Sequence, residues 1–255
     1  MKRFAYFTLM LMVVAGLTAC KQNSEQNNLS EAQKCLDNVP ESDPTQAESC
    51  MATIENYSDP QADILKCSIT ITYGGLTEDK IVAAYNIFAD NSQTNQAASF
   101  MAALSLSDPT NSANPDYTLA QQANAYCLAS GDLGLIYISD MILAGTYLNQ
   151  TIQSLTSSGI NINDPSSVNT AVNTLLGDCA GTTPSATCQQ NLAGLGSAAS
   201  SLAGAYCNTS GADQSVCGQV NSAVSSAGSS STAVGQALLC YMNKKTYDPT
   251  TNACQ

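Results

Sequence analysis

The amino-acid sequence predicts an all-α, disulfide-stapled body made of helical hairpins. Helix-start signals recur after residue 30 at steps of about 15–17 residues, the length of one short helix with its turn. Ten cysteines follow Cys20, an even number that fits a framework of disulfides. The hydrophobic content of 44% is close to the globular average, so the chain has enough apolar surface to form a core.

The first four predicted helix starts have capping signals. Ser30 begins the capping box Ser-x-x-Gln, and Thr45 begins a second box that ends at Glu48. Asp43 and Asp59 each precede a proline, which is favoured in the first helical turn. Thr77 is followed by two acids, where the helix dipole favours negative charge. We therefore expect helices to begin near residues 30, 45, 60 and 77, with another near 94.

Aromatic side chains recur within the predicted helices. Ile81, Tyr85 and Phe88 share one face at helical spacing, which predicts an amphipathic helix with that face on the core. The tyrosines in predicted helices are expected to pack in the core with their hydroxyls at a polar edge; these are Tyr85, Tyr126, Tyr137 and Tyr147.

Residues 30–106 resemble tetratricopeptide-like helical-hairpin repeats. The segments ESDPTQAESC and YSDPQADILKC are alike, and Cys35, Cys50 and Cys67 follow the same step. Two such steps make about 33 residues, close to the repeat length of that family. The chain departs from the family because it has no Trp and does not place the family's Leu-Gly and Tyr positions in register. The resemblance implies an array of α-hairpins.

The remainder of the chain divides into a few further elements. Residues 108–118 are predicted as a loop, 117–129 as a helix and 133–148 as a buried core helix that is too short and too polar at Asp140 for a membrane span. Asp140 is either a hydrogen-bonded structural carboxyl or a perturbed acid in a pocket. Beyond residue 157 the chain is rich in Ala, Ser and Gly, so we divide the body into regions 30–156 and 157–255. Helices are expected at 166–178, 186–206, 213–226 and 231–243, with a loop at 225–232 and a turn at 247–250.

The cysteine pattern predicts pairing between near neighbours, with free buried thiols as the alternative. No CxxC motif is present, so neither a thioredoxin-like site nor a zinc ribbon is indicated. The predicted disulfides are Cys35–Cys50, Cys67–Cys127, Cys179–Cys188, Cys207–Cys217 and Cys240–Cys254.

The composition excludes several classes of function. The chain has no His, so Ser-His-Asp and Cys-His catalysis and the usual His-containing zinc sites cannot form. No Lys or Arg lies between Lys80 and Lys244, so the chain is not expected to bind nucleic acid. The nucleophile elbow, the phosphate loop, the GxGxxG fingerprint and the EF-hand loop are all absent. We therefore predict no catalytic residue, no metal site and no cofactor.

The first twenty residues resemble the signal peptide and lipobox of bacterial lipoproteins. Lys2 and Arg3 precede an apolar segment that ends in Leu17-Thr18-Ala19-Cys20. The resemblance implies that residues 1–19 are removed, that Cys20 is lipidated, and that the lipid attaches the chain to a membrane. Cleavage removes two of the eight cations and no acid, so the net charge falls from −12 to −14. The polar residues 20–29 are expected to form a flexible tether.

These features predict where the protein lies and what kind of function it has. Lys21 follows the lipidated position in place of Asp, which in lipoprotein sorting favours the outer membrane of the cell envelope. We expect a non-enzymatic, membrane-tethered scaffold that binds an envelope protein partner. The alternative is a small-ligand carrier or transporter-accessory lipoprotein with a cavity between its helices, since helical periplasmic lipoproteins that associate with transporters have this general architecture.

Overall fold

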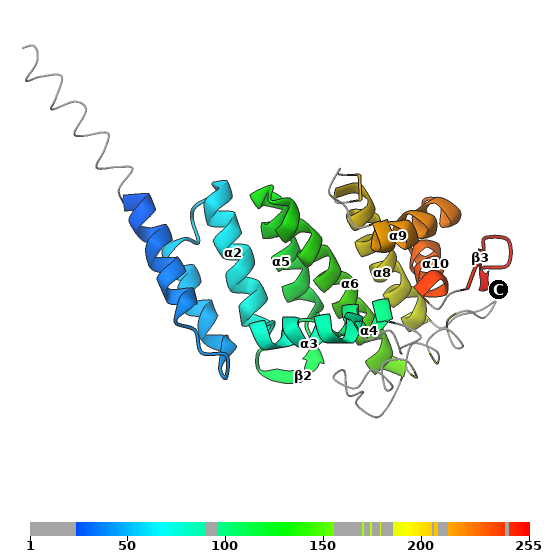
Figure 1. The fold of residues 1–255 in the computed structure, drawn as a ribbon, viewed down its shortest axis with the longest axis horizontal. Helices are drawn as coiled ribbons and strands as arrows, with labels where there is room; N and C mark the ends of the chain where they lie inside the picture. Colours follow the sequence, from blue (N-terminus) through cyan, green and yellow to red (C-terminus); the bar gives the residue numbers. More distant parts are fainter. Residues whose placement is uncertain are drawn as a thin grey trace, which may run out of the picture.

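The computed structural model is an array of helices with two small hairpins, which confirms the all-α class (Figure 1). It describes residues 24–89, 96–155, 170, 174, 179, 186–205, 207–208, 214–242 and 245–255. The signal peptide and Cys20 lie outside these residues, as does most of the helix predicted at 166–178. Within the described residues no helix is both long enough and apolar enough to span a bilayer.

A small core joins the first three helical segments, which lie at residues 24–37, at η1 (Pro44–Thr53) and at α2 (Pro60–Tyr73). The predicted helix start at Ser30 is wrong, because residues 24–29 of the expected tether are already helical. Tertiary contacts favour the longer helix: Asn28 Nδ2 donates to Tyr57 Oη at 2.7 Å, and Leu29 packs on this core. The buried members of the core are Ala32, Ala47, Cys50, Ile54, Leu65 and Ile69.

Two Asp-Pro signals give different helix starts. The Asp59 carboxylate accepts hydrogen bonds from the backbone N–H groups of Gln61 and Ala62 at 3.0 and 3.1 Å, so it caps α2 as predicted. Asp43 instead accepts from the side chains of Thr45 and Gln46, at 2.5 and 2.9 Å. The segment after Asp43 is a 3₁₀ helix that begins at Pro44, and Thr45 lies inside it and not at its cap.

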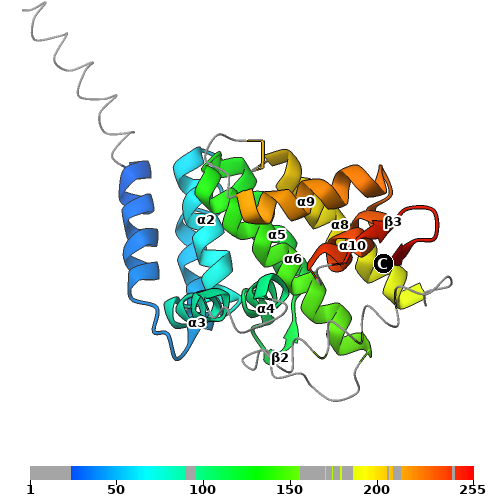
Figure 2. The same cartoon turned by 45° about the vertical axis from the view of Figure 1, so that its right-hand side comes forward.

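After α2, the array includes contacts between helices that are not consecutive in sequence. Helices α3 (Glu78–Ala89) and α4 (Gln96–Ala103) lie across the row of helices, and α2 packs against α5 (Tyr117–Ser130) (Figure 2). The regular hairpin order expected over residues 30–106 therefore ends at α2. Helix α5 begins as predicted, because Asp116 accepts from the Leu119 N–H at 2.9 Å.

The segment predicted as a loop at 108–118 contains an antiparallel hairpin, so that prediction is wrong in part. Strand β1 (Ser107–Asp108) pairs with β2 (Asn111–Pro115), with Asp108 opposite Asn111. The Asp108 carboxylate accepts from the N–H and the hydroxyl of Thr110, which closes the turn.

The second half continues the array. Its elements are α6 (Leu133–Leu155), α8 (Ala186–Ala205), α9 (Gln214–Ala227), α10 (Ser231–Met242), β3 (Tyr247–Asp248) and β4 (Ala253–Cys254). The predicted turn at 247–250 is part of the β3–β4 hairpin. The predicted loop at 225–232 shrinks to residues 228–230, because Gly228 with φ 68° allows a sharp turn between α9 and α10.

One large core crosses the boundary that we drew between residues 156 and 157. It contains buried side chains from α2, α5, α6, α8, α9 and α10, so the two regions do not have separate cores. Close packing of α8 explains this result: a Cβ on Gly194 would lie 2.0 Å from the Tyr147 ring of α6, a contact that only glycine allows. The enrichment in Ala, Ser and Gly beyond residue 157 therefore marks helices that pack at a shorter distance and not a domain boundary.

The ten cysteines form five disulfides that join the predicted near neighbours. Cys67–Cys127 connects α2 to α5 across 60 residues and bypasses α3 and α4. The other four close loops of 9–15 residues; these are Cys35–Cys50, Cys179–Cys188, Cys207–Cys217 and Cys240–Cys254.

Candidate functional site

A buried polar cluster lies where α5, α6 and α8 meet. Asp140 on α6 has no exposed surface, and its Oδ1 accepts from Asn124 Nδ2 at 2.8 Å and from Ser201 Oγ at 3.0 Å. Asn124 Nδ2 also lies 3.1 Å from Ser139 Oγ. The Asp140 Oδ2 atom is buried and has no hydrogen-bond partner among the residues that the structure describes. Burial raises the pKa of the Asp140 carboxyl, and the hydrogen bonds from Asn124 and Ser201 oppose this rise.

This cluster fits a structural role better than a catalytic one. The carboxyl has no exposed surface, so a substrate in solvent does not reach it. Its hydrogen bonds join α6 to the preceding helix α5 and to α8, whose Ser201 lies 61 residues away, as buried polar groups in cores commonly do. Of the two readings open for Asp140, the geometry therefore favours the hydrogen-bonded structural carboxyl.

Replacement of Asp140 by Asn is expected to reduce the dependence of stability on pH. A carboxyl whose pKa is raised by folding binds its proton more tightly in the folded state, so wild-type stability falls as pH rises from about 4 through the folded pKa. Urea unfolding across this range should show the variant gaining stability relative to wild type by about 1.4 kcal/mol for each pKa unit that folding adds. Glu55→Gln, at an exposed position, is the control. A constant difference between Asp140→Asn and wild type at every pH would contradict the prediction.

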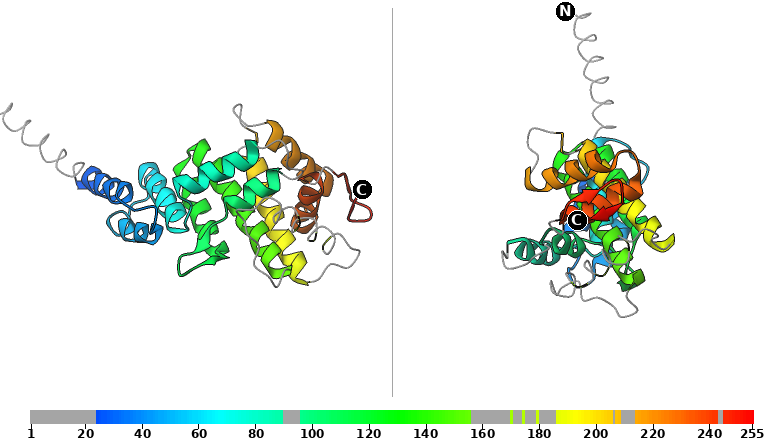
Figure 3. Two further views of the ribbon diagram at one scale, coloured as in Figure 1. Left: turned by 60° about the horizontal axis from the view of Figure 1, so that its bottom comes forward. Right: turned by 90° about the vertical axis from the view of Figure 1, so that its right-hand side faces the viewer.

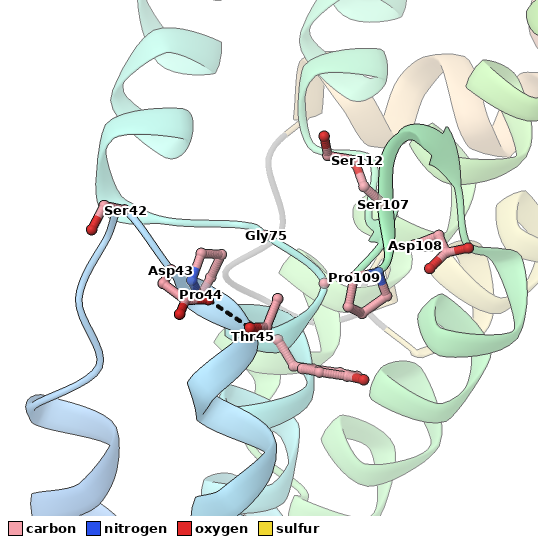
Figure 4. A pocket seen from close by; sticks show the side chains of 11 residues that line it. Ser42, Asp43, Pro44, Thr45, Gly75, Ser107, Asp108, Pro109 and Ser112 are labelled. Atoms are coloured by element: carbon pink, nitrogen blue, oxygen red, sulfur yellow. Dashed lines mark hydrogen bonds between the residues drawn. The ribbon is translucent and has the colours of Figure 1, made fainter.

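A pocket of about 170 Å³ lies between η1, the end of α2 and the β1–β2 hairpin (Figure 4). Side chains with hydroxyl groups line it, together with two carboxylates, Asp43 and Asp108. Hydrogen bonds from Thr45 and Gln46 lower the pKa of Asp43, and those from Thr110 lower the pKa of Asp108. Both acids are therefore ionised at neutral pH, but their oxygens already accept hydrogen bonds from residues of the turns in which they lie. Pockets that enclose drug-sized ligands have about 300–1,000 Å³, so this one suits only a smaller group.

The apolar face of α3 is exposed, which contradicts the prediction that Ile81 and Tyr85 pack on the core. Ile81 is 45% exposed and Tyr85 is 64% exposed, and Val82 beside them is 51% exposed. The helix packs on α4 at the edge of the array, as the views in Figure 3 show. Among the described helices, α4 is the one with which α3 makes its main contact, and the side of α3 that carries Ile81 and Tyr85 stays largely exposed. Phe88, the third predicted member, lies in α3, and its side chain is outside the described part.

The other tyrosines behave as predicted. Tyr126, Tyr137 and Tyr147 are partly buried against the main core. The Tyr147 ring lies 4.0 Å from the Tyr117 ring, measured between centroids. Burial raises the pKa of the Tyr147 hydroxyl. These side chains pack against the main core on α5 and α6.

The oxygen-rich stretch from Asp108 to Asp116 forms turns and a helix cap. Asp108 closes the β1–β2 turn, Asn111 Oδ1 accepts from the Ala113 N–H at 3.3 Å, and Asp116 caps α5. Within the described ranges, no group of three or more Cys, Asp or Glu side chains could hold a metal ion.

Sequence reasoning missed two features of the surface. It did not identify Val82 as part of the α3 face, although Val82 follows Glu78 by one helical turn. It also missed the pocket, because its walls come from three separate segments.

Comparisons with protein-family models, curated protein sequences and solved structures found no match.

Proposed function

We propose that this chain is a non-enzymatic cell-envelope lipoprotein, tethered by a lipid on Cys20, that binds a protein partner. The observation that carries the partner-binding part is the exposed apolar face of α3, which we call the α3 face and define as Ile81, Val82 and Tyr85. Contiguous apolar side chains on the surface of a protein commonly mark an interaction site. The tether rests on the lipobox alone.

Two further observations support a binding function over the alternatives. The chain has no His, and its buried carboxyl Asp140 is not accessible to solvent, so neither feature supports catalysis. The pocket beside Asp43 and Asp108 is smaller than usual ligand sites and contains one tyrosine, Tyr73, and no methionine. A small-ligand carrier therefore has less support than a partner-binding module.

In-cell photo-crosslinking tests the partner. A photoreactive phenylalanine analogue at Tyr85 should give a discrete protein adduct on intact cells, because this side chain is the most exposed of the α3 face. The matched control is the same analogue at Leu128 on α5, a 40% exposed apolar residue outside that face. Absence of an adduct at Tyr85, or the same adduct at both positions, would overturn the partner-binding proposal.

Replacement of Cys20 by Ala is expected to move the protein from the membrane fraction to the soluble fraction. Each methylene group buried in a bilayer contributes about 0.8 kcal/mol, so several acyl chains anchor the protein firmly. The strongly acidic chain itself is repelled by anionic lipids and does not attach by charge. Cell fractionation with immunodetection measures the change. Ser30→Ala, an exposed change that leaves the lipobox intact, should stay membrane-bound. Membrane attachment of Cys20→Ala would contradict the lipid tether.

A further inference from the structure

The α3 face has one acidic end. Glu78 precedes Ile81 by three residues and Val82 by four, and Tyr85 follows one turn later. Residues at this spacing share one side of a helix, so Glu78 continues the exposed apolar stripe at its N-terminal end. Asp79 lies beside Glu78 in the same first turn, and both acids are exposed.

A third carboxylate from another segment joins this end. Glu41 lies in the connection between the first helix and η1 and is exposed. Repulsion from Asp79, with smaller contributions from desolvation, from the hydrogen bond to Asp79 and from Glu78, raises the pKa of the Glu41 carboxyl. Glu41 therefore lies close to Asp79 in the fold, although the two acids are far apart in sequence. We call Glu41, Glu78 and Asp79 the acidic cluster.

Two buried or partly buried lysines of this half of the chain, Lys80 and Lys66, are directed to other groups. Lys80 Nζ donates to the Ser105 carbonyl at 3.1 Å, and burial lowers the pKa of its amine, so it is directed into the body of the protein. Lys66 lies 3.9 Å from Asp63, donates to the Tyr57 carbonyl and is 5% exposed. In the described part of the chain, the acidic cluster forms no ion pair with Lys or Arg.

We propose that the α3 face and the acidic cluster together bind a basic amphipathic helix of a partner protein. This inference rests on the proposed function and specifies the chemistry of the partner. The apolar side of such a helix covers Ile81, Val82 and Tyr85, and its Lys or Arg side chains lie against the three carboxylates. An anionic membrane is repelled by the same carboxylates. A second copy of this chain brings its own acidic cluster and no exposed cation on α3.

Two synthetic peptides of equal length test this charge preference. Both have the same apolar residues at positions i, i+3, i+4 and i+7, and their polar positions are Lys in one and Glu in the other. The protein is the mature chain with Cys20→Ala and its five disulfides intact, and fluorescence anisotropy measures binding. The Lys peptide should bind at least about tenfold more tightly at low salt, and the difference should shrink as salt rises from about 10 to 300 mM.

Matched variants assign the binding to this surface. Val82→Ser with Tyr85→Ser should weaken binding of the Lys peptide about tenfold, whereas Leu128→Ser on α5 should leave it unchanged. Charge reversal by Glu78→Lys with Asp79→Lys should make the Glu peptide the tighter ligand, which loss of folding cannot produce. Circular dichroism should show the same helix content in each variant.

Several outcomes would overturn the inference. One is equal affinity for the two peptides, and another is binding of the Lys peptide that survives Val82→Ser with Tyr85→Ser. A third is binding of the unlipidated chain to anionic lipid vesicles through this face. A fourth is a dimer, seen in sedimentation, that Tyr85→Ser dissociates. If Tyr85 gives a crosslinked protein adduct but the protein binds the Lys and Glu peptides equally, this inference is rejected and the proposed function stands. No adduct at Tyr85 rejects the proposed function itself.

Discussion

Replacement of Gly196 by Ala should destabilise the protein by about 3 kcal/mol, at the upper end of the usual cost of overpacking a core. A Cβ at this position on α8 would lie 1.8 Å from the Ser231 carbonyl oxygen and 2.7 Å from the Gly235 nitrogen of α10. Both are backbone atoms, so no side chain can rotate away and the two helices must separate. Separation exposes apolar surface of the main core, which is the source of the cost.

A glycine on the same helix provides the control. A Cβ at Gly204 meets nothing within 4 Å, and the position is exposed. Gly204→Ala should therefore stabilise by about 0.5–1 kcal/mol, because Ala has the higher helix propensity. Urea unfolding followed by circular dichroism measures both changes. Equal effects at the two positions would show that α8 and α10 do not pack at the distance seen here.

Removal of the Cys67–Cys127 disulfide by a double Ala replacement is expected to cost about 4 kcal/mol. The bridge closes a loop of 60 residues, and the entropy that a cross-link removes from the unfolded chain grows with loop length. It also joins α2 to α5, the contact that leaves α3 at the edge of the array. The variant should unfold at lower urea concentration and should lose order around α3 and α4 first, as hydrogen exchange would detect.

The Cys179–Cys188 disulfide is the matched comparison. All four cysteines are buried, with 0–1% exposure, so the cavities left by Ala are similar. The loop that Cys179–Cys188 closes has a sequence separation of 9 residues, and its double Ala variant should lose about 2–3 kcal/mol. A larger loss at Cys179–Cys188 than at Cys67–Cys127 would contradict the loop-length argument.

Local signals predicted the helix starts where the capping group and the helix are neighbours in sequence. Asp59 and Asp116 cap α2 and α5 because their carboxylates reach N–H groups two or three residues later. The capping box at Ser30 met the same local criteria and was wrong. The hydrogen bond of Asn28 to Tyr57, which lies between η1 and α2, and the packing of Leu29 on the small core favour extension of that helix toward the N-terminus, and no local pattern contains those contacts.

The candidate site was only partly accessible to sequence reasoning. The periodicity of Ile81 and Tyr85 correctly indicates an apolar helix face, but it does not say whether another element covers that face. Glu41 joins Asp79 across a long separation in sequence, so no spacing rule could pair them. The same limit applies to Asp140, whose partner Ser201 lies 61 residues away.

The sequence by itself indicated the helical class, an even set of cysteines able to form disulfides, and the lack of histidine chemistry. These properties follow from composition and from local hydrogen-bonding signals, which the order of residues sets directly, whereas the pairing of the cysteines was a prediction that the fold had to decide. The tertiary structure decided that α2 packs on α5, that one core crosses residue 157, and that the α3 face remains exposed beside three carboxylates. Those outcomes depend on which helices can approach closely, and glycines such as Gly194 and Gly196 set that distance only when their partners on other helices are in place.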